Sequence, residues 1–184
     1  GKGDFKEISF LSPTDTNRLA TEPLDERVRY GPGVLTSIYQ LSYGHPFYTQ
    51  LICTNAVDHL NSHRRYDMGA EDLDEVVRTI VNNPPPQLVY DWEQFTHQEQ
   101  LVLSLLSEVS TAPHEPVAPE ALLAAIDTNE YPIDISSADL HGVLDSLDGR
   151  MVLSRSDSGG YHFLVDLVRL WIRRNRSVWR LVEE

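Results

Sequence analysis

Three consecutive prolines at positions 84–86 interrupt the sequence, directly after Asn82 and Asn83. A proline ring fixes φ and removes the backbone N–H, so no helix continues through such a run, and an extended polyproline conformation is favoured. We therefore expect a proline-rich connector over residues 84–95. It divides the 184-residue chain into a helical segment at 12–83 and a second domain at 96–184, which is enough length for two small domains.

The segment before the prolines carries signals for four helices joined by short connections. Ser12, Pro13 and Asp15 form the start signal of the first helix. Gly44 is expected to end the second helix and Pro46 to begin the third. Apolar residues at helical spacing then predict the buried faces of the second, third and fourth helices: Val34, Leu35, Ile38 and Leu41; Phe47, Leu51, Ile52, Ala56 and Leu60; Leu73, Val76, Val77, Ile80 and Val81.

The segment after the prolines predicts three helices followed by a β-hairpin. Thr96 with Glu99, Pro119, and Ser136 with Asp139 mark the three helix starts. Short strands at 151–153 and 161–163 flank a turn at 156–160, and a last helix is expected over residues 165–181. Three helices and a hairpin in this order are typical of a winged helix. The expected fold class is therefore mainly α: a four-helix, lid-like subdomain followed by a winged-helix domain with a small β-hairpin.

Charge argues against a DNA-binding role. The chain has 15 lysines and arginines against 28 acidic residues, a net charge of −13. The third helix of the predicted winged helix, at 136–147, has two aspartates and no lysine or arginine, although a helix in the major groove needs cations and base-reading donors. Positive charge collects at the C-terminal end, where phosphate or acidic partners could bind, but we favour pairing of this segment with the acidic remainder of the chain. The arginines concerned are Arg169, Arg173, Arg174, Arg176 and Arg180.

Catalytic motifs are missing. The sequence contains no G-x-x-x-x-G-K-[ST], no G-x-G-x-x-G and no G-x-S-x-G. One cysteine, Cys53, excludes an internal disulfide, and a buried thiol without an adjacent base is expected to be inert. Neither a membrane-spanning run nor a signal peptide is seen, so a cytoplasmic protein is expected. The chain begins with Gly1 and quickly enters an ordered pattern, which suggests a piece of a longer protein.

Two clusters of polar residues are candidates for metal-binding or catalytic sites. His59 and His63 are four residues apart on a predicted helix, but no glutamate stands between them as in H-E-x-x-H. We interpret His63, with Arg64 and Arg65, as cations at a helix C-terminus, and expect no metal site. Asp72, Asp74 and Glu75 are interpreted as solvated acids at a helix N-terminus.

Residues 38–53, with the sequence IYQLSYGHPFYTQLIC, carry a family resemblance. They resemble the "T-x-G-H-P-[YF]-x-x-Q-x-[LI]-C" segment in the helical lid of STAND-type ATPases, which are related to the archaeal AAA+ ATPases. Residues 8–15 resemble the end of that family's nucleotide-binding core, and residues 165–171 are similar to the run that closes its winged helix.

The resemblance implies a role and a site. Residues 1–11 would end a nucleotide-binding core, and Gly44, His45 and Pro46 would contact the adenine of ATP or ADP. Related proteins use a histidine of the winged helix to reach the β-phosphate, but Val165 stands at that position, and His162 lies three residues earlier. Valine donates no hydrogen bond, so no phosphate contact is carried over.

The expected function is therefore that of a non-catalytic regulatory part of a multidomain signalling ATPase. ATP or ADP with Mg²⁺ would be held by the parent, and none tightly by this chain alone. The expected partners are the parent's NTPase core and further copies in a homo-oligomer. Two alternatives stay open: a winged-helix transcriptional regulator, and a stand-alone adaptor that binds proteins.

Overall fold

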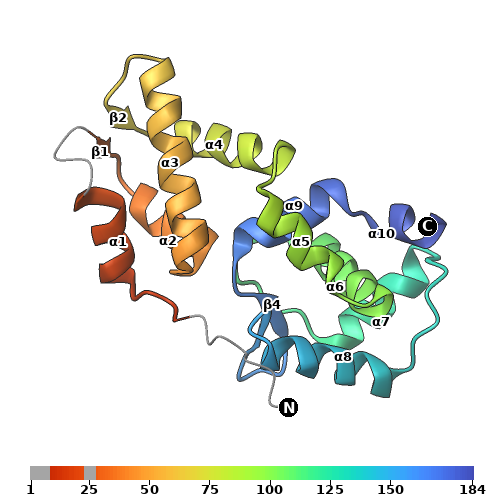
Figure 1. Cartoon of the computed structure of the whole chain (residues 1–184). Helices are drawn as coiled ribbons and strands as arrows, with labels where there is room; N and C mark the ends of the chain where they lie inside the picture. The colour runs from red at the N-terminus through yellow and green to blue at the C-terminus, as the bar shows by residue number, and fades with distance from the viewer. Residues whose placement is uncertain (1–8, 23–27) are drawn as a thin grey trace, which may run out of the picture. The chain divides into compact units, whose positions relative to one another are not determined.

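The computed structural model describes residues 9–22 and 28–184 (Figure 1). The described chain is mainly helical, with two pairs of short strands. Residues 1–11 were predicted to end a nucleotide-binding core, and most of them lie outside the described residues. The chain divides into two compact units, residues 1–78 and 79–184. This division falls inside a helix, before the predicted connector at 84–95.

The N-terminal unit contains the four predicted helices and one strand pair. The helices are α1 (Pro13–Thr21), α2 (Val34–Ser42), α3 (Pro46–Ser62) and α4 (Ala70–Asn82), the last of which runs past the unit boundary. The signal at Ser12 is confirmed, because its Oγ accepts from the Asp15 N–H at 3.1 Å. Two strands that the sequence did not predict, β1 (Arg29–Tyr30) and β2 (Asp67–Met68), pair in parallel.

The core of this unit follows most of the predicted apolar positions, although Leu35, Leu51 and Val77 are only half-buried. Phe47 was expected in the buried face of α3, but its side chain is 38% exposed. The buried face runs instead through Tyr48, Thr49, Ile52 and Ala56, one position further along the helix at its start. The prediction for Phe47 was therefore wrong, because an apolar side chain next to a buried stripe does not always enter it.

After the end of α4, the C-terminal unit forms a helix where an extended connector was expected. Pro85 is extended (φ −65°, ψ 148°), but Pro86 occupies the first turn of α5 (Pro86–Glu93). Proline suits that position, because the first turn of a helix leaves its N–H groups unpaired. Leu88 and Trp92 of α5 are buried, and the Trp92 ring meets the Trp171 ring edge-on at 5.8 Å.

The remaining elements of this unit are three helices, a hairpin and two short helices. They are α6 (His97–Val109), α7 (Pro119–Thr128), α8 (Ser137–Gly149), β3 (Leu153–Arg155), β4 (Tyr161–Phe163), α9 (Asp166–Asn175) and α10 (Val178–Glu183). The strands β3 and β4 are antiparallel, and Val117 forms a bridge to Tyr161 of β4. The predicted capping box at Thr96 and Glu99 is present in both directions.

The last predicted helix, over 165–181, is broken in two. Arg176 leaves the helical region (φ −135°, ψ 56°), and Ser177 caps α10. Ser104 of α6 donates to the Arg176 carbonyl at 2.5 Å, and Glu108 of the same helix accepts from the Val178 N–H at 3.1 Å. Side chains of α6 thus satisfy the backbone groups that the break exposes, which no local pattern in residues 165–181 could reveal.

Candidate functional site

The turn between α2 and α3 contains the three predicted adenine-contacting residues. Tyr43 and Gly44 both take left-handed conformations, with φ of 50° and 70°. His45 is extended and precedes Pro46, which begins α3. The predicted helix stop and start are therefore confirmed at this turn, and the three residues lie together on the described part of the chain.

Gly44 is required by the chain itself. Its carbonyl accepts from the Leu11 N–H at 2.7 Å, and a Cβ placed on Gly44 would lie 2.1 Å from the Leu11 carbonyl oxygen. No side chain fits at that distance. The glycine is thus explained by its approach to Leu11, and it gives no independent sign of a ligand.

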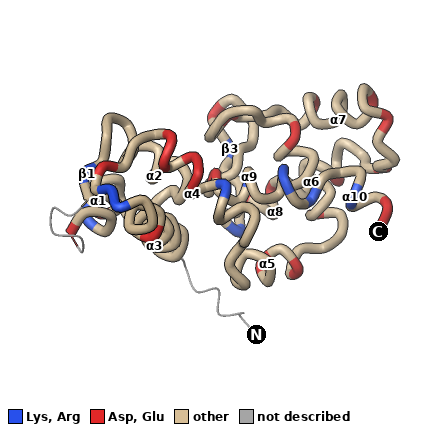
Figure 2. Tube along the Cα trace, turned by 90° about the horizontal axis from the view of Figure 1, so that it is seen from above, with Lys and Arg blue, Asp and Glu red and all other residues tan. Residues whose placement is uncertain are grey.

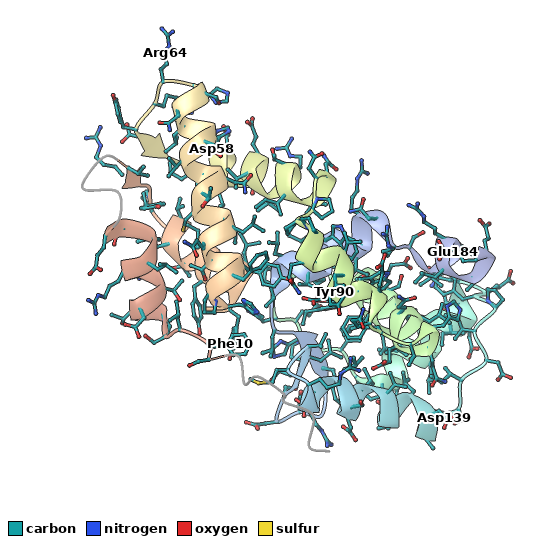
Figure 3. The ribbon with its side chains drawn as sticks, viewed as in Figure 1. Phe10, Asp58, Arg64, Tyr90, Asp139 and Glu184 are labelled. Atoms are coloured by element: carbon teal, nitrogen blue, oxygen red, sulfur yellow. The ribbon has the colours of Figure 1, made fainter. Side chains whose placement is uncertain are left out.

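Aromatic rings surround the turn. The His45 ring meets Tyr48 at 4.8 Å, Phe10 at 5.8 Å and Phe47 at 6.4 Å between centroids, each in an edge-on arrangement (Phe10 is labelled in Figure 3). Phe10 also meets Tyr43 at 5.7 Å. Edge-on pairs of this kind are favourable and fix the orientation of the rings.

The surface of the turn is apolar and exposed. Pro46 is exposed, Phe47 is 38% exposed, and the Phe47 ring packs edge-on against buried Tyr48 at 5.2 Å. An exposed proline ring and a phenyl ring oriented by edge-on contacts offer flat apolar area, onto which a purine or another planar group can stack. The sequence resemblance found Gly44, His45 and Pro46, but not Phe47.

Val165, which stands where the resembling family has its phosphate-contacting histidine, lies in a region with a structural role. Val165 is 7% exposed at the start of α9, and next to it Asp166 forms a buried ion pair with Arg169, with Nε donating to Oδ1 at 2.6 Å. Arg169 also donates to the Ser110 carbonyl at 3.0 Å. The sequence favoured pairing of this arginine with the acidic remainder of the chain, but its ion-pair partner Asp166 lies in the same C-terminal segment. His162 is half-buried, with its ring 5.4 Å from that of His114.

The sequence predicted that the acids at the start of α4 are all solvated, but one of them is buried. Asp74 and Glu75 are exposed, but Asp72 is 7% exposed. Burial opposes the charged form of Asp72, yet hydrogen bonds from the Gly69 N–H, His59 and Arg65 outweigh it and lower the Asp72 pKa to about 2. The interpretation was wrong for Asp72, because its partners His59 and Arg65 lie outside its own helix.

Cys53 behaves as expected from the sequence. It is a free, half-buried thiol, and burial raises its pKa to about 11. A thiol with that pKa stays protonated near neutral pH and is a poor nucleophile.

The helix that a winged helix would place in DNA is acidic. Figure 2 colours the charged residues of the described chain by sign. Within the described residues, α8 contains Asp139, Asp145 and Asp148 and no lysine or arginine. Such a helix would be repelled by the phosphate backbone.

None of the helices in the described part of the chain combines the length and the apolar character that crossing a membrane requires. Comparison with protein-family models, with curated proteins and with solved structures found no match for this chain.

Proposed function

We propose that this chain is the lid and winged-helix part of a multidomain signalling ATPase, in which the turn at residues 44–46 closes over the adenine of ATP or ADP. The chain itself would not be catalytic. It would relay the nucleotide state of the parent's NTPase core to attached domains.

The observation that carries the proposal is the surface of the turn. Pro46 and Phe47 are exposed, while the rings of His45 and Tyr48 contact the Phe47 ring edge-on. The backbone below is pinned by the contact between Gly44 and Leu11. A flat apolar surface on a rigid turn suits a purine, because stacking needs little reorganisation of the protein.

The C-terminal unit gives secondary support. After α5, the helices α6, α7 and α8 precede the antiparallel hairpin, and Val117 bridges to Tyr161; three helices and a hairpin in this order are typical of a winged helix. The acidic α8 argues against DNA reading, so a regulatory role fits this unit better than transcriptional control.

A stand-alone adaptor is the second candidate, and an exposed tryptophan favours it. Trp179 of α10 is 49% exposed, and its ring lies edge-on to Tyr131 at 5.2 Å. Exposed tryptophans are enriched at protein interfaces, so α10 is the surface that this alternative would use.

The test is a titration of ADP and ATP on the full-length parent and its variants. Loss of one stacking partner costs about 1–3 kcal/mol, so Phe47→Ala should weaken nucleotide binding roughly tenfold, and Pro46→Ala should weaken it as well. Tyr66→Ala is the matched control, because Tyr66 is a 66% exposed aromatic residue of the same unit. His162→Ala should also bind like the wild type.

Two outcomes would reject the proposal. If Phe47→Ala and Pro46→Ala are folded by circular dichroism and bind both nucleotides like the wild type, the turn only separates two helices. The chain is assigned as non-catalytic because its sequence contains no Walker A phosphate loop. If the purified 184-residue chain hydrolyses ATP on its own, that assignment is wrong.

A further inference from the structure

Two histidines and a glutamate come together where the end of α3 meets α4. His59 and His63 are one helical turn apart, and their ring centroids are 4.4 Å from each other. Glu75 comes from α4, with Oε2 at 3.8 Å from Nδ1 of His59. Each of the three residues offers one ligand atom within 4.8 Å of those of the other two. All three belong to the N-terminal unit, so the cluster does not depend on how the two units are arranged.

The hydrogen bonds of His59 determine which nitrogen can bind a metal. Nε2 of His59 lies 3.0 Å from Oδ1 of Asp72, and an ionised carboxylate can only accept. Nε2 therefore carries the proton, and Nδ1, the nitrogen that faces Glu75, holds the lone pair. Asp72 is fixed in turn by Arg65, which donates to its two oxygens at 2.8 and 3.1 Å.

His63 is oriented in a similar way by the backbone. Its Nδ1 lies 2.8 Å from the His59 carbonyl oxygen, which can only accept, so Nδ1 carries the proton. The lone pair of His63 is then on Nε2. Metal-binding histidines usually donate their second N–H to a carboxylate or a backbone carbonyl, which fixes the tautomer, and here each histidine has one of these two partners.

If the His59 ring is neutral and no cation is present, the contact between its Nδ1 and Glu75 is unfavourable. When Nε2 carries the only proton of the ring, the lone pair of Nδ1 faces the Glu75 carboxylate at 3.8 Å. A divalent cation between these atoms converts a repulsive contact into two bonds. An imidazolium at His59, paired with both Asp72 and Glu75, is the competing explanation.

We propose that His59, His63 and Glu75 form a Zn²⁺ site. Two imidazoles and one carboxylate are a known zinc ligand set, with water in the fourth position. Nitrogen ligands make Mg²⁺ and Ca²⁺ poor occupants. Tetrahedral ligands with bonds near 2.0–2.1 Å lie about 3.4 Å apart, so the cluster must contract. His63 and Glu75 are exposed and can move, while His59, with 13% side-chain exposure, stays in place.

The proposed site joins two helices that the sequence separates. A zinc ion would link the C-terminal end of α3 to the second turn of α4 across the loop that contains β2. Figure 3 shows Arg64, in that loop, pointing away from the end of α3, so its charge is directed toward solvent. The proposal is independent of nucleotide binding.

The test is a Co²⁺ titration of the untagged chain, followed by its visible absorption and then by displacement with Zn²⁺. We expect tetrahedral Co²⁺ bands that saturate at one ion per chain and disappear when Zn²⁺ is added. His63→Ala and Glu75→Gln should weaken Co²⁺ binding at least tenfold. Both residues are exposed, so both variants should fold. His97→Ala is the matched control, because His97 is an exposed histidine of α6 outside the cluster.

Asp72, which accepts from Nε2 of His59, gives an independent readout. Asp72→Asn should weaken metal binding about 10- to 100-fold, the usual effect of losing such a partner. The proposal is overturned if the wild type shows no saturable Co²⁺ bands and Zn²⁺ does not raise its unfolding midpoint; the cluster is then an ion-pair network around His59. It is also overturned if His97→Ala weakens binding as much as His63→Ala, since binding is then to scattered surface histidines.

Discussion

Replacing Gly44 by alanine should destabilise the N-terminal unit far more than the same change at Gly33. Both glycines have positive φ, 70° at Gly44 and 77° at Gly33. A Cβ on Gly33 would have no atom within 4 Å, whereas a Cβ on Gly44 would lie 2.1 Å from the Leu11 carbonyl oxygen. Comparing the two variants therefore separates the cost of left-handed backbone strain, which both share, from the cost of steric collision, which only Gly44→Ala has.

The magnitudes follow from these two terms. Left-handed strain costs roughly 1 kcal/mol for alanine, and this is the whole expected loss for Gly33→Ala. Gly44→Ala adds a forced shift of the Leu11 backbone, and overpacking of this kind costs about 1–3 kcal/mol. We expect a total loss of about 3 kcal/mol in the free energy of unfolding of the N-terminal unit.

Urea unfolding followed by two spectroscopic signals measures the effect. The three tryptophans, Trp92, Trp171 and Trp179, all belong to the C-terminal unit, so tryptophan fluorescence reports that unit, while far-UV circular dichroism reports both. Gly44→Ala should lower the midpoint of the circular dichroism transition and leave the fluorescence transition unchanged. Equal losses for Gly44→Ala and Gly33→Ala would refute the reasoning, because Leu11 would then not be held against the turn.

Three further outcomes are expected. Arg169→Ala should lower the free energy of unfolding by about 3–5 kcal/mol, measured by tryptophan fluorescence, because it leaves Asp166 charged and buried without its partner. Arg173→Ala, at an exposed position, should cost under about 0.5 kcal/mol, and similar losses for the two variants would contradict a structural ion pair. Burial and the hydrogen bond to Asp145 raise the pKa of Tyr161 to about 12, so the folded chain keeps a proton that the unfolded chain loses near pH 10. The free energy of unfolding should therefore fall as pH rises from about 10 to 12, and Tyr161→Phe should show a smaller fall in alkaline urea titrations; an identical pH profile would exclude this source. Duplex DNA should bind weakly and lose binding by about 0.2 M salt in an anisotropy titration, and a sequence-selective complex above that salt concentration would overturn the charge argument.

The positions of most helices follow from the sequence alone, because their ends depend on neighbouring residues. Ser12, Thr96 and Ser136 each accept a hydrogen bond from the N–H three residues later, and Pro46 occupies the first turn of α3. These interactions act within one turn, so a local pattern is sufficient to predict them. The predicted turn at residues 44–46 is confirmed for the same reason.

Features that depend on contacts distant in sequence were decided by the tertiary structure. The break between α9 and α10 is held by Ser104 and Glu108 of α6, some seventy residues earlier. Asp72 is buried because Arg65 and His59 reach it from outside α4. The same packing brings Glu75 beside two histidines that the sequence alone presents as a helix end. Sequence patterns describe interactions within one or two helical turns, whereas helix packing determines which groups surround a buried charge or a candidate metal site.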